Sequence, residues 1–460
     1  MVNCTFSNNN AKQGGAGVYL KDSNVTFSSC SFVSNTANSV GSGGALLIED
    51  SNVSFSTSSF LNNSSAYQGG AIRYTNSVGS ITDSNFTQNL NTFANGGGAI
   101  YLDNSPINFD NCTFSENSTQ ANNYGGAVKL SASSANFSNC LFTRNSSPLH
   151  SAGAIYVDSS SSPTFSGNEF HYNSSGQFGG AILTESPLTF SGGRFLGNYA
   201  NFGGGVSNVG SINLSFEKVM IIGNEANVSN SSSGGFAYFG GSGANTTFVN
   251  CMISGNKSTH RNGVFRGNGS NRFVNCSIVG NQSVNEGGIA LLQTGDSVAI
   301  ENSIIWQNTS LTSGNDFFVN NQSILANYSI FDPSQSTESI SGTSNKNLNP
   351  GLIDANGTDN LYGTLDDDFS LLNNSPAINS GSAGVANYQT TDINGNSRLG
   401  LPEIGAFEFL SNTLPVITTD ANQTTSENTS IVVEISATDA NSDILVYMIT
   451  GGSDQSLFVI

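Results

Sequence analysis

A Phe followed three residues later by Asn recurs through the first 200 residues at intervals of 25 to 28 residues, and Ile replaces the Phe further on. A repeat of this period is typical of a solenoid, in which each repeat is one structural unit that buries its apolar face only by stacking on its neighbours. The pairs are Phe6/Asn9, Phe32/Asn35, Phe60/Asn63, Phe86/Asn89, Phe114/Asn117, Phe142/Asn145, Phe170/Asn173 and Phe195/Asn198, then Ile221/Asn224, Ile253/Asn256, Ile278/Asn281 and Ile305/Asn308.

A second motif, Gly-Gly-Ala followed by an aliphatic residue, lies between successive copies of the first, as at 43–46, 69–72 and 97–100. From its first Gly to the next Phe or Ile is 16 to 19 residues, whereas 9 to 13 residues separate that Phe or Ile from the following Gly pair. Each repeat therefore has one segment of nearly fixed length and one variable loop. Binding residues are often carried by loops on a rigid scaffold, so the variable loops are the candidate binding face.

Apolar residues alternate within the fixed segment, as in 100–102, 107–109 and 112–114. Period-two alternation interrupted by turn residues predicts three short strands in each repeat. We expect an all-β fold, a right-handed single-stranded parallel β-helix of about twelve coils. The Phe is expected to form an internal stack, the Asn to adopt left-handed dihedral angles at a corner, and the Gly pair to mark a close approach between coils.

Six cysteines share one place in the repeat, two residues before the Phe or Ile: Cys4, Cys30, Cys112, Cys140, Cys251 and Cys276. Neighbouring parallel strands seldom offer the dihedral angle that a disulfide needs, so we favour small buried side chains over cross-coil disulfides. The disulfide alternative stays open, because an exported protein permits it.

The net charge of −19, with only 13 Lys and Arg residues, argues against nucleic acid and against anionic polysaccharide as partners. No stretch is long and apolar enough for a transmembrane segment. The sequence opens within a repeat, so we interpret it as a fragment at both ends of a longer protein.

The alternating motifs resemble the repeats of the polymorphic outer-membrane protein family over roughly residues 4 to 310. This resemblance implies a secreted or cell-surface adhesion protein, extracellular or on the bacterial outer membrane, with a surface protein or glycan as partner. Residues 349–409 resemble the closing segment of secreted bacterial β-helix proteins. We therefore expect a β-helix over 1–330 and a C-terminal cap over 331–410, because a cap must cover the last open coil.

From Leu414 onward the sequence resembles the first half of a cadherin-like β-sandwich, so we expect a partial β-sandwich over 411–460. Under this resemblance Glu427, Asp439, Asn441 and Asp443 are candidate calcium ligands. Calcium is the one cofactor that the sequence suggests.

β-Helices also include carbohydrate-active enzymes, either polysaccharide lyases or glycoside hydrolases, which need convergent carboxylates or a base on one face. The repeats show no such convergence, so we predict a protein without catalytic residues and keep the enzyme as the alternative. We interpret two acidic segments, 366–368 and 392–396, as hydrogen-bonded turns. We interpret the three histidines and one set of four basic residues as surface side chains. These are His150, His171 and His260, and Lys257, Arg261, Arg266 and Arg272.

Overall fold

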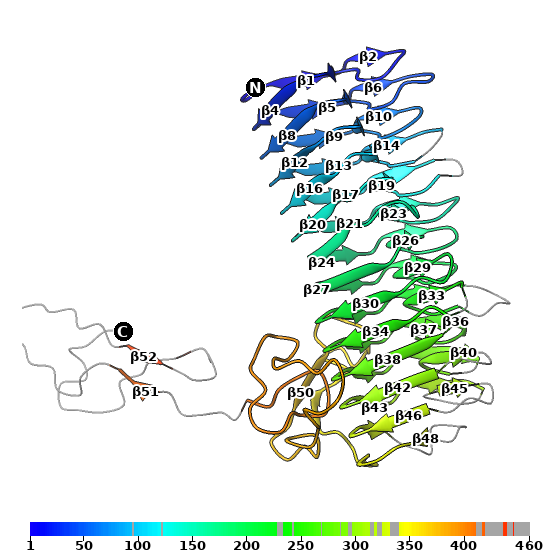
Figure 1. Cartoon of the computed structure of the whole chain (residues 1–460), viewed down its shortest axis with the longest axis vertical. Coiled ribbons are helices and arrows are strands. Elements are labelled where there is room, and N and C mark those ends of the chain that lie inside the picture. The colour runs from blue at the N-terminus through cyan, green and yellow to red at the C-terminus, as the bar shows by residue number, and fades with distance from the viewer. Residues whose placement is uncertain are drawn as a thin grey trace, which may run out of the picture. The chain divides into compact units, whose positions relative to one another are not determined.

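The computed structural model describes residues 1–93, 96–120, 123–227, 233–241, 243–267, 269–285, 287–292, 297–312, 317–319, 324–331, 340–410, 416–418, 436–438 and 445. The chain divides into two compact units, Met1–Glu408 and Phe409–Ile460. The first unit is the predicted right-handed parallel β-helix, with its coils stacked in chain order (Figure 1).

Each coil contributes strands to three sheets, called sheets A, B and C. Sheet C follows the Gly pair; its strands are β3 (Val18–Lys21), β7 (Leu46–Glu49), β11 (Ile72–Thr75), β15 (Ile100–Asp103), β19 (Val128–Ser131), β23 (Ile155–Val157), β26 (Ile182–Thr184), β29 (Val206–Asn208), β33 (Ala237–Phe239), β37 (Phe265–Arg266), β41 (Ala290–Leu292) and β45 (Phe317–Val319).

Sheet A has two strands from most coils, arranged in two columns. Column A1 contains β4 (Asn24–Ser28), β8 (Asn52–Ser56), β12 (Gly79–Thr82), β16 (Ile107–Asp110), β20 (Asn136–Ser138), β30 (Leu214–Glu217), β34 (Thr246–Val249), β38 (Ser270–Val274), β42 (Ser297–Glu301), β46 (Ile324–Asn327) and β48 (Ile340–Ser341). Column A2 contains the Phe-x-x-Asn strands β1 (Thr5–Ser7), β5 (Ser31–Val33), β9 (Ser59–Leu61), β13 (Asn85–Thr87), β17 (Thr113–Ser115), β21 (Leu141–Thr143), β31 (Met220–Ile222), β35 (Met252–Ser254), β39 (Ser277–Val279), β43 (Ile304–Trp306) and β47 (Ile330–Phe331). Two long strands, β24 (Thr164–His171) and β27 (Leu188–Leu196), pass through both columns.

Sheet B follows the Asn and consists of short strands, mostly of two residues, that the sequence analysis did not predict. They are too short to show as an alternation of apolar and polar residues. They are β2 (Asn10–Ala11), β6 (Thr36–Ala37), β10 (Ser64–Ser65), β14 (Leu90–Asn91), β18 (Ser118–Thr119), β22 (Ser146–Ser147), β25 (Ser174–Ser175), β28 (Tyr199–Ala200), β32 (Glu225–Ala226), β36 (Lys257–Arg261), β40 (Gln282–Asn285) and β44 (Thr309–Ser310).

The core contains the predicted aromatic stack and a second one beside it. In column A2 the rings from Phe6 to Phe195 stack with centroids 4.4–5.0 Å apart. In column A1 a parallel stack runs from Phe27 to Phe273 at 4.7–5.3 Å, interrupted at Ile81. The two stacks meet edge to face, which is a favourable geometry for aromatic rings.

The motif asparagines form a continuous hydrogen-bonded ladder from Asn9 to Asn308. Each side-chain amide donates to the carbonyl oxygen of the next asparagine side chain at 2.8–3.0 Å. From Asn35 onward it also donates to a backbone oxygen of a preceding coil, for example that of Phe114 from Asn145. The prediction of left-handed dihedral angles was misplaced by one residue, because the positive φ belongs to the residue before the Asn, such as Asn62 or Glu116.

The Gly pair has the predicted role. The first Gly has a positive φ, as Gly69 shows at +62°, and a Cβ on the second, Gly70, would overlap the carbonyl oxygen of Gly98 in the next coil. The cysteines are free thiols, and they occupy turn positions that serines occupy in other coils. Ser58 Oγ and Cys140 Sγ each donate to the carbonyl oxygen two residues earlier. The thiol therefore makes the same turn hydrogen bond as the serine hydroxyl, and it is also a small buried group.

The described residues of the segment that we expected to cap the rod form two parts with different positions. Residues 340–346 add to the last coil, since β48 pairs with β46 and Lys346 bridges to Ile330. Residues 349–408, called here the lateral segment, include the antiparallel pair β49 (Leu352–Asp354) and β50 (Asp368–Leu371) and pack against the side of sheet A. Figure 1 shows this segment in orange beside the later coils.

Hydrogen bonds from four corner residues between columns A1 and A2 hold the lateral segment in place. Lys218 Nζ donates to Thr391 Oγ1 at 2.7 Å, and Asn302 Nδ2 donates to the carbonyl oxygen of Ser382 at 2.8 Å. Asn250 and Asn275 donate in the same way to the carbonyl oxygens of Thr391 and Glu403.

In the second unit the described residues form one antiparallel pair, β51 (Val416–Ile417) with β52 (Ala437–Thr438). None of the described residues belongs to a helix long and apolar enough to cross a membrane.

Candidate binding face

Sheet C presents an outward row of side chains that the variable loops partly cover. The Gly pair directly precedes each strand of sheet C, so the loops end at this sheet and their side chains lie next to its outer face. We call this surface, sheet C together with the preceding loops, the loop face. The outward residues at the centre of the strands are Tyr19, Leu47, Arg73, Tyr101, Lys129, Tyr156, Leu183, Ser207, Tyr238 and Arg266.

Lys129 lies at the centre of an aromatic cluster on the loop face. Its Nζ is 5.6, 5.4 and 5.3 Å from the ring centroids of Tyr101, Tyr124 and Tyr156, within the range of cation–π attraction. Tyr124 comes from a variable loop, and its ring also packs against His150 from the next loop, with centroids 4.2 Å apart. Loops and sheet together therefore build a site that neither contains alone.

Burial and charge both perturb this cluster. Burial lowers the pKa of the Lys129 ammonium, while the carboxylates of Asp158 and Glu185 oppose that shift. Burial also lowers the pKa of His150, and Lys129 adds to this effect. The hydroxyl of Tyr156 donates to Glu185 Oε1 at 2.7 Å, and burial followed by this contact raises the pKa of the phenol. The loop face therefore brings together four groups that can exchange protons, on Lys129, His150, Tyr156 and Glu185. We did not predict this cluster from the sequence.

The aromatic row continues in both directions from Lys129. Toward the later coils Phe178 and Phe202 stack at 4.9 Å, and both rings contact Tyr238. The guanidinium of Arg266 lies 4.9 Å from the centre of the Tyr238 ring. Toward the earlier coils the rings are exposed: Tyr19 by 52%, Tyr67 by 37% and Phe93 by 70%.

The candidate site residues from the sequence have different outcomes. Glu427, Asp439, Asn441 and Asp443 lie outside the described residues, so calcium binding there stays a prediction. The four basic residues do not form one cluster, because Lys257 and Arg261 belong to sheet B, Arg266 to sheet C and Arg272 to sheet A, where Arg272 binds Glu301.

His150 is half-buried against Tyr124, so it is a surface residue as interpreted, but one that packs against a ring and is less solvated than expected. His171 Nε2 is 2.6 Å from Glu169 Oε2. The two acidic turns are hydrogen-bonded turns as interpreted. Asp366 accepts bonds from the backbone and hydroxyl of Thr358, and Asp392 accepts from the backbone nitrogen of Asn394.

Within the described parts of the chain no three His, Cys, Asp or Glu side chains gather closely enough to hold a metal ion. One carboxyl pair, Glu403 and Glu408, is strongly perturbed; burial, and then its neighbour, raise the pKa of Glu403 to about 8. Both side chains are buried in the lateral segment beside Arg398, at 2% and 8% exposure. A substrate has no access to them there, so we assign this pair a structural role.

The comparisons with known proteins concern the β-helix. The family described as "Right handed beta helix region" matches residues 1–148 and 43–258, which together span more than half of the 460 residues. The crystal structure of pectate lyase Pel9A is similar at 16% identity, with 84% of this chain and 88% of that chain covered and a TM-score of 0.38. No curated protein matches the chain.

Proposed function

Because the chain belongs to the right-handed β-helix family, we propose that it is a non-catalytic binding protein of the cell exterior, whose loop face binds a glycan. The observation that carries the proposal is the aromatic row from Tyr19 to Tyr238. Aromatic rings with a few polar groups beside them are the usual lining of a small-molecule site, and their apolar faces suit the carbon–hydrogen faces of sugar rings. Stacked coils repeat about every 4.8 Å, so a linear polymer lying along the row meets a side chain of sheet C at each step and an aromatic ring at several of them.

The extracellular or cell-surface location is part of this proposal, as are the resemblances to polymorphic outer-membrane proteins and to a cadherin-like, calcium-binding module. The low content of charged residues, 10%, and the motifs of residues 4 to 310 support it.

The test is affinity electrophoresis of the full chain against a panel of neutral polysaccharides. We expect at least one polymer to retard the protein, and Phe93→Ala to weaken that retardation by roughly fivefold or more, since removal of a stacking ring costs about 1 kcal/mol or more. Leu399→Ala is the matched control, because Leu399 is equally exposed, at 73%, but belongs to the lateral segment. Failure of every polymer to retard the wild type contradicts the proposal.

The Lys129 cluster favours a second candidate, a carbohydrate-active enzyme. A lysine whose pKa burial lowers is a potential base, and the imidazole of His150 and the Tyr156 hydroxyl, which donates to Glu185, lie on the same surface. Release of reducing ends from any polymer that binds, abolished by Lys129→Met and retained in Leu399→Ala, would establish the enzyme. Binding without release supports the non-catalytic protein.

A further inference from the structure

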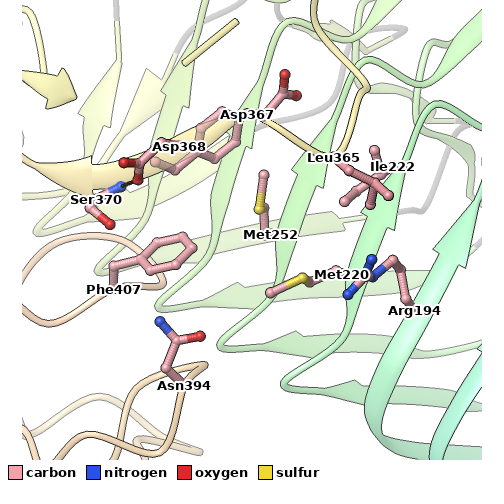
Figure 2. A pocket seen from close by; sticks show the side chains of 11 residues that line it. Arg194, Met220, Ile222, Met252, Leu365, Asp367, Asp368, Ser370, Asn394 and Phe407 are labelled. Atoms are coloured by element: carbon pink, nitrogen blue, oxygen red, sulfur yellow. Dashed lines mark hydrogen bonds between the residues drawn. The ribbon is translucent and has the colours of Figure 1, made fainter. Parts of the chain in front are cut away.

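A pocket of about 300 Å³ lies between column A2 and the lateral segment, on a different sheet from the loop face. The rod contributes side chains from β27, β31 and β35, and the lateral segment contributes β50, the turn just before it and two later loops (Figure 2). It is lined by Arg194, Met220, Ile222, Met252, Leu365, Asp367, Asp368, Phe369, Ser370, Asn394 and Phe407.

The walls of the pocket are apolar on both sides. Met220, Ile222 and Met252 come from the rod, and Phe369 and Phe407 come from the lateral segment. Figure 2 shows the ring of Phe407 pointing toward the two methionines. Thioethers are polarizable and adapt their shape, and an aromatic ring offers a flat face, so these walls suit a small ligand with an apolar surface.

Polar groups with unused hydrogen-bonding capacity also line the pocket. One oxygen of Asp368 accepts the backbone N–H of Ser370 at 2.9 Å, and the other has no partner among the described residues. The Ser370 hydroxyl and the Asn394 side-chain amide likewise have no partner within the described chain, and Asn394 is exposed. Glu169 Oε2 lies 3.5 Å from the Nε of Arg194 in an ion pair, and the terminal nitrogens of the guanidinium have no hydrogen-bond partner among the described residues.

Fixed contacts position this lining. The carboxylate of Asp367 accepts hydrogen bonds from the Ser254 hydroxyl and from the backbone N–H of Gly363. The bond from Ser254 links the start of β50 to β35. Asp392 closes the turn that carries Asn394. A site whose walls are held by such contacts requires little reorganisation when a ligand binds.

We propose that this pocket binds a single neutral pyranose ring. Its volume lies at the lower end of the range for small-molecule sites, which fits one ring better than an oligosaccharide. The lining has two carboxyl groups, Asp367 and Asp368, against one guanidinium that is already paired with Glu169, so the pocket disfavours an anionic ligand. The apolar walls contact the faces of the ring, while Asp368, Asn394 and Arg194 bind its hydroxyls. The site is independent of the loop face.

The test is ligand-observed NMR, followed by calorimetry, on the full chain with glucose, galactose, mannose and N-acetylglucosamine. We expect one of these sugars to bind. We expect Asp368→Asn to weaken it by about tenfold, since a hydrogen bond to a charged group is worth about 1.5 kcal/mol or more. Asn394→Ala is also expected to weaken binding of the sugar. The control Leu399→Ala is expected to leave binding unchanged, because Leu399 is an exposed side chain outside the pocket lining.

Two outcomes overturn this proposal: no sugar binds, or a sugar binds equally well to the wild type, Asp368→Asn and Asn394→Ala. Phe93→Ala separates the two sites, because it weakens polysaccharide retention at the loop face but leaves monosaccharide binding to the pocket unchanged. A monosaccharide that loses affinity in Phe93→Ala binds the loop face, which also overturns the proposal.

Discussion

The outer face of column A2 differs between the earlier and the later coils of the β-helix. In the earlier coils its outward residues are mostly small or polar and half-buried, as at Thr113 and Ser115 of β17. In the later coils, under the lateral segment, they include Met220, Ile222 and Met252 and are largely buried. The inward motif residue changes from Phe to Ile at residue 221, whereas the Asn ladder continues unchanged through both regions. The outer face of column A2 therefore differs between bare and covered coils on a shared ladder.

The corner before the ladder Asn shows the same contrast. Bare coils place ordinary residues there with a left-handed backbone, such as Gln88 and Glu116 at φ of 54° and 56°. Three covered coils have Gly223, Gly255 and Gly280, whereas the next coil keeps Gln307, whose side chain accepts a hydrogen bond from Tyr362. A Cβ on each of these glycines would overlap Gly363 or Tyr362 of the lateral segment. Glycine is therefore needed at this corner for the close approach of another segment, because the backbone itself tolerates a side chain.

The largest effect is expected to be the same in both regions. Asn145→Leu in a bare coil and Asn256→Leu in a covered coil each remove a ladder amide. Each leaves one backbone N–H and one backbone carbonyl oxygen without the amide partner, those of Asn117 and Phe114 or those of Asn224 and Ile221. We expect a loss of about 3 to 5 kcal/mol in the free energy of unfolding for each. Denaturant unfolding of the full chain measures both. A loss in only one region would show that the ladder is not a common support.

The corner glycine gives the sharpest contrast between the regions. Gly255→Gln places a side chain where Gly363 lies, so we expect the lateral segment to undock at a cost of about 2 to 4 kcal/mol. Limited proteolysis within 349–408 and thermal unfolding measure the change. The reverse substitution in a bare coil, Gln88→Gly, is expected to change stability by less than about 1 kcal/mol. Equal effects would refute the role given to the covering segment.

The outward methionine gives a smaller effect. Met252 is 3% exposed, and Met252→Ser removes apolar contact with the lateral segment, for an expected loss of about 2 to 3 kcal/mol. Leu141 has the equivalent place on β21, where no such segment covers it. Leu141→Ser is expected to cost less than about 1 kcal/mol. Hydrogen exchange of the lateral segment is expected to increase in the first variant only.

The smallest expected effect is a pH dependence confined to the covered region. Burial, and then Glu408, raise the pKa of Glu403 to about 8, above its usual value near 4.5. A raised carboxyl pKa means that the folded state favours the protonated form. Its stabilising contribution is present in full below about pH 4.5 and is lost as the pH rises toward 8. Glu408 and Arg398 are the buried charged neighbours of Glu403, and Asp392 is in turn a neighbour of Arg398.

We therefore expect proteolysis of the lateral segment to be faster at pH 9 than at pH 6, and Glu403→Gln to reduce that difference. Glu116→Gln, in a bare coil, serves as the control. A segment that is equally protected at both pH values would show that the buried pair does not contribute to docking.

The repeat period, the alternation and the Gly pair were sufficient to predict the β-helix, the Phe stack and the close approach between coils, because each feature recurs in register. The second stack was missed since its members, such as Phe109 and Phe137, occur outside the Phe-x-x-Asn motif. The left-handed residue was placed on the Asn rather than before it. The residue before the Asn differs from coil to coil, as Gln88 and Glu116 show, so a single sequence reveals no preference at that position.

The lateral packing and the Lys129 cluster were not predicted, because both join residues from different coils or distant segments. The change from Phe-x-x-Asn to Ile-x-Gly-Asn at 221–224, 253–256 and 278–281 is the sequence signal that precedes the covered region. Loop lengths vary before sheet C, so spacing alone does not bring Tyr124 and His150 together.

The most direct test of the proposed function is hydrogen–deuterium exchange of the full chain with the polysaccharide that retards it most. We expect protection of the described loop-face residues from Tyr67 to Tyr238, with no change at the bare outer face of column A2. Protection confined to column A2 or to the lateral segment, or no protection with any polymer, would contradict it.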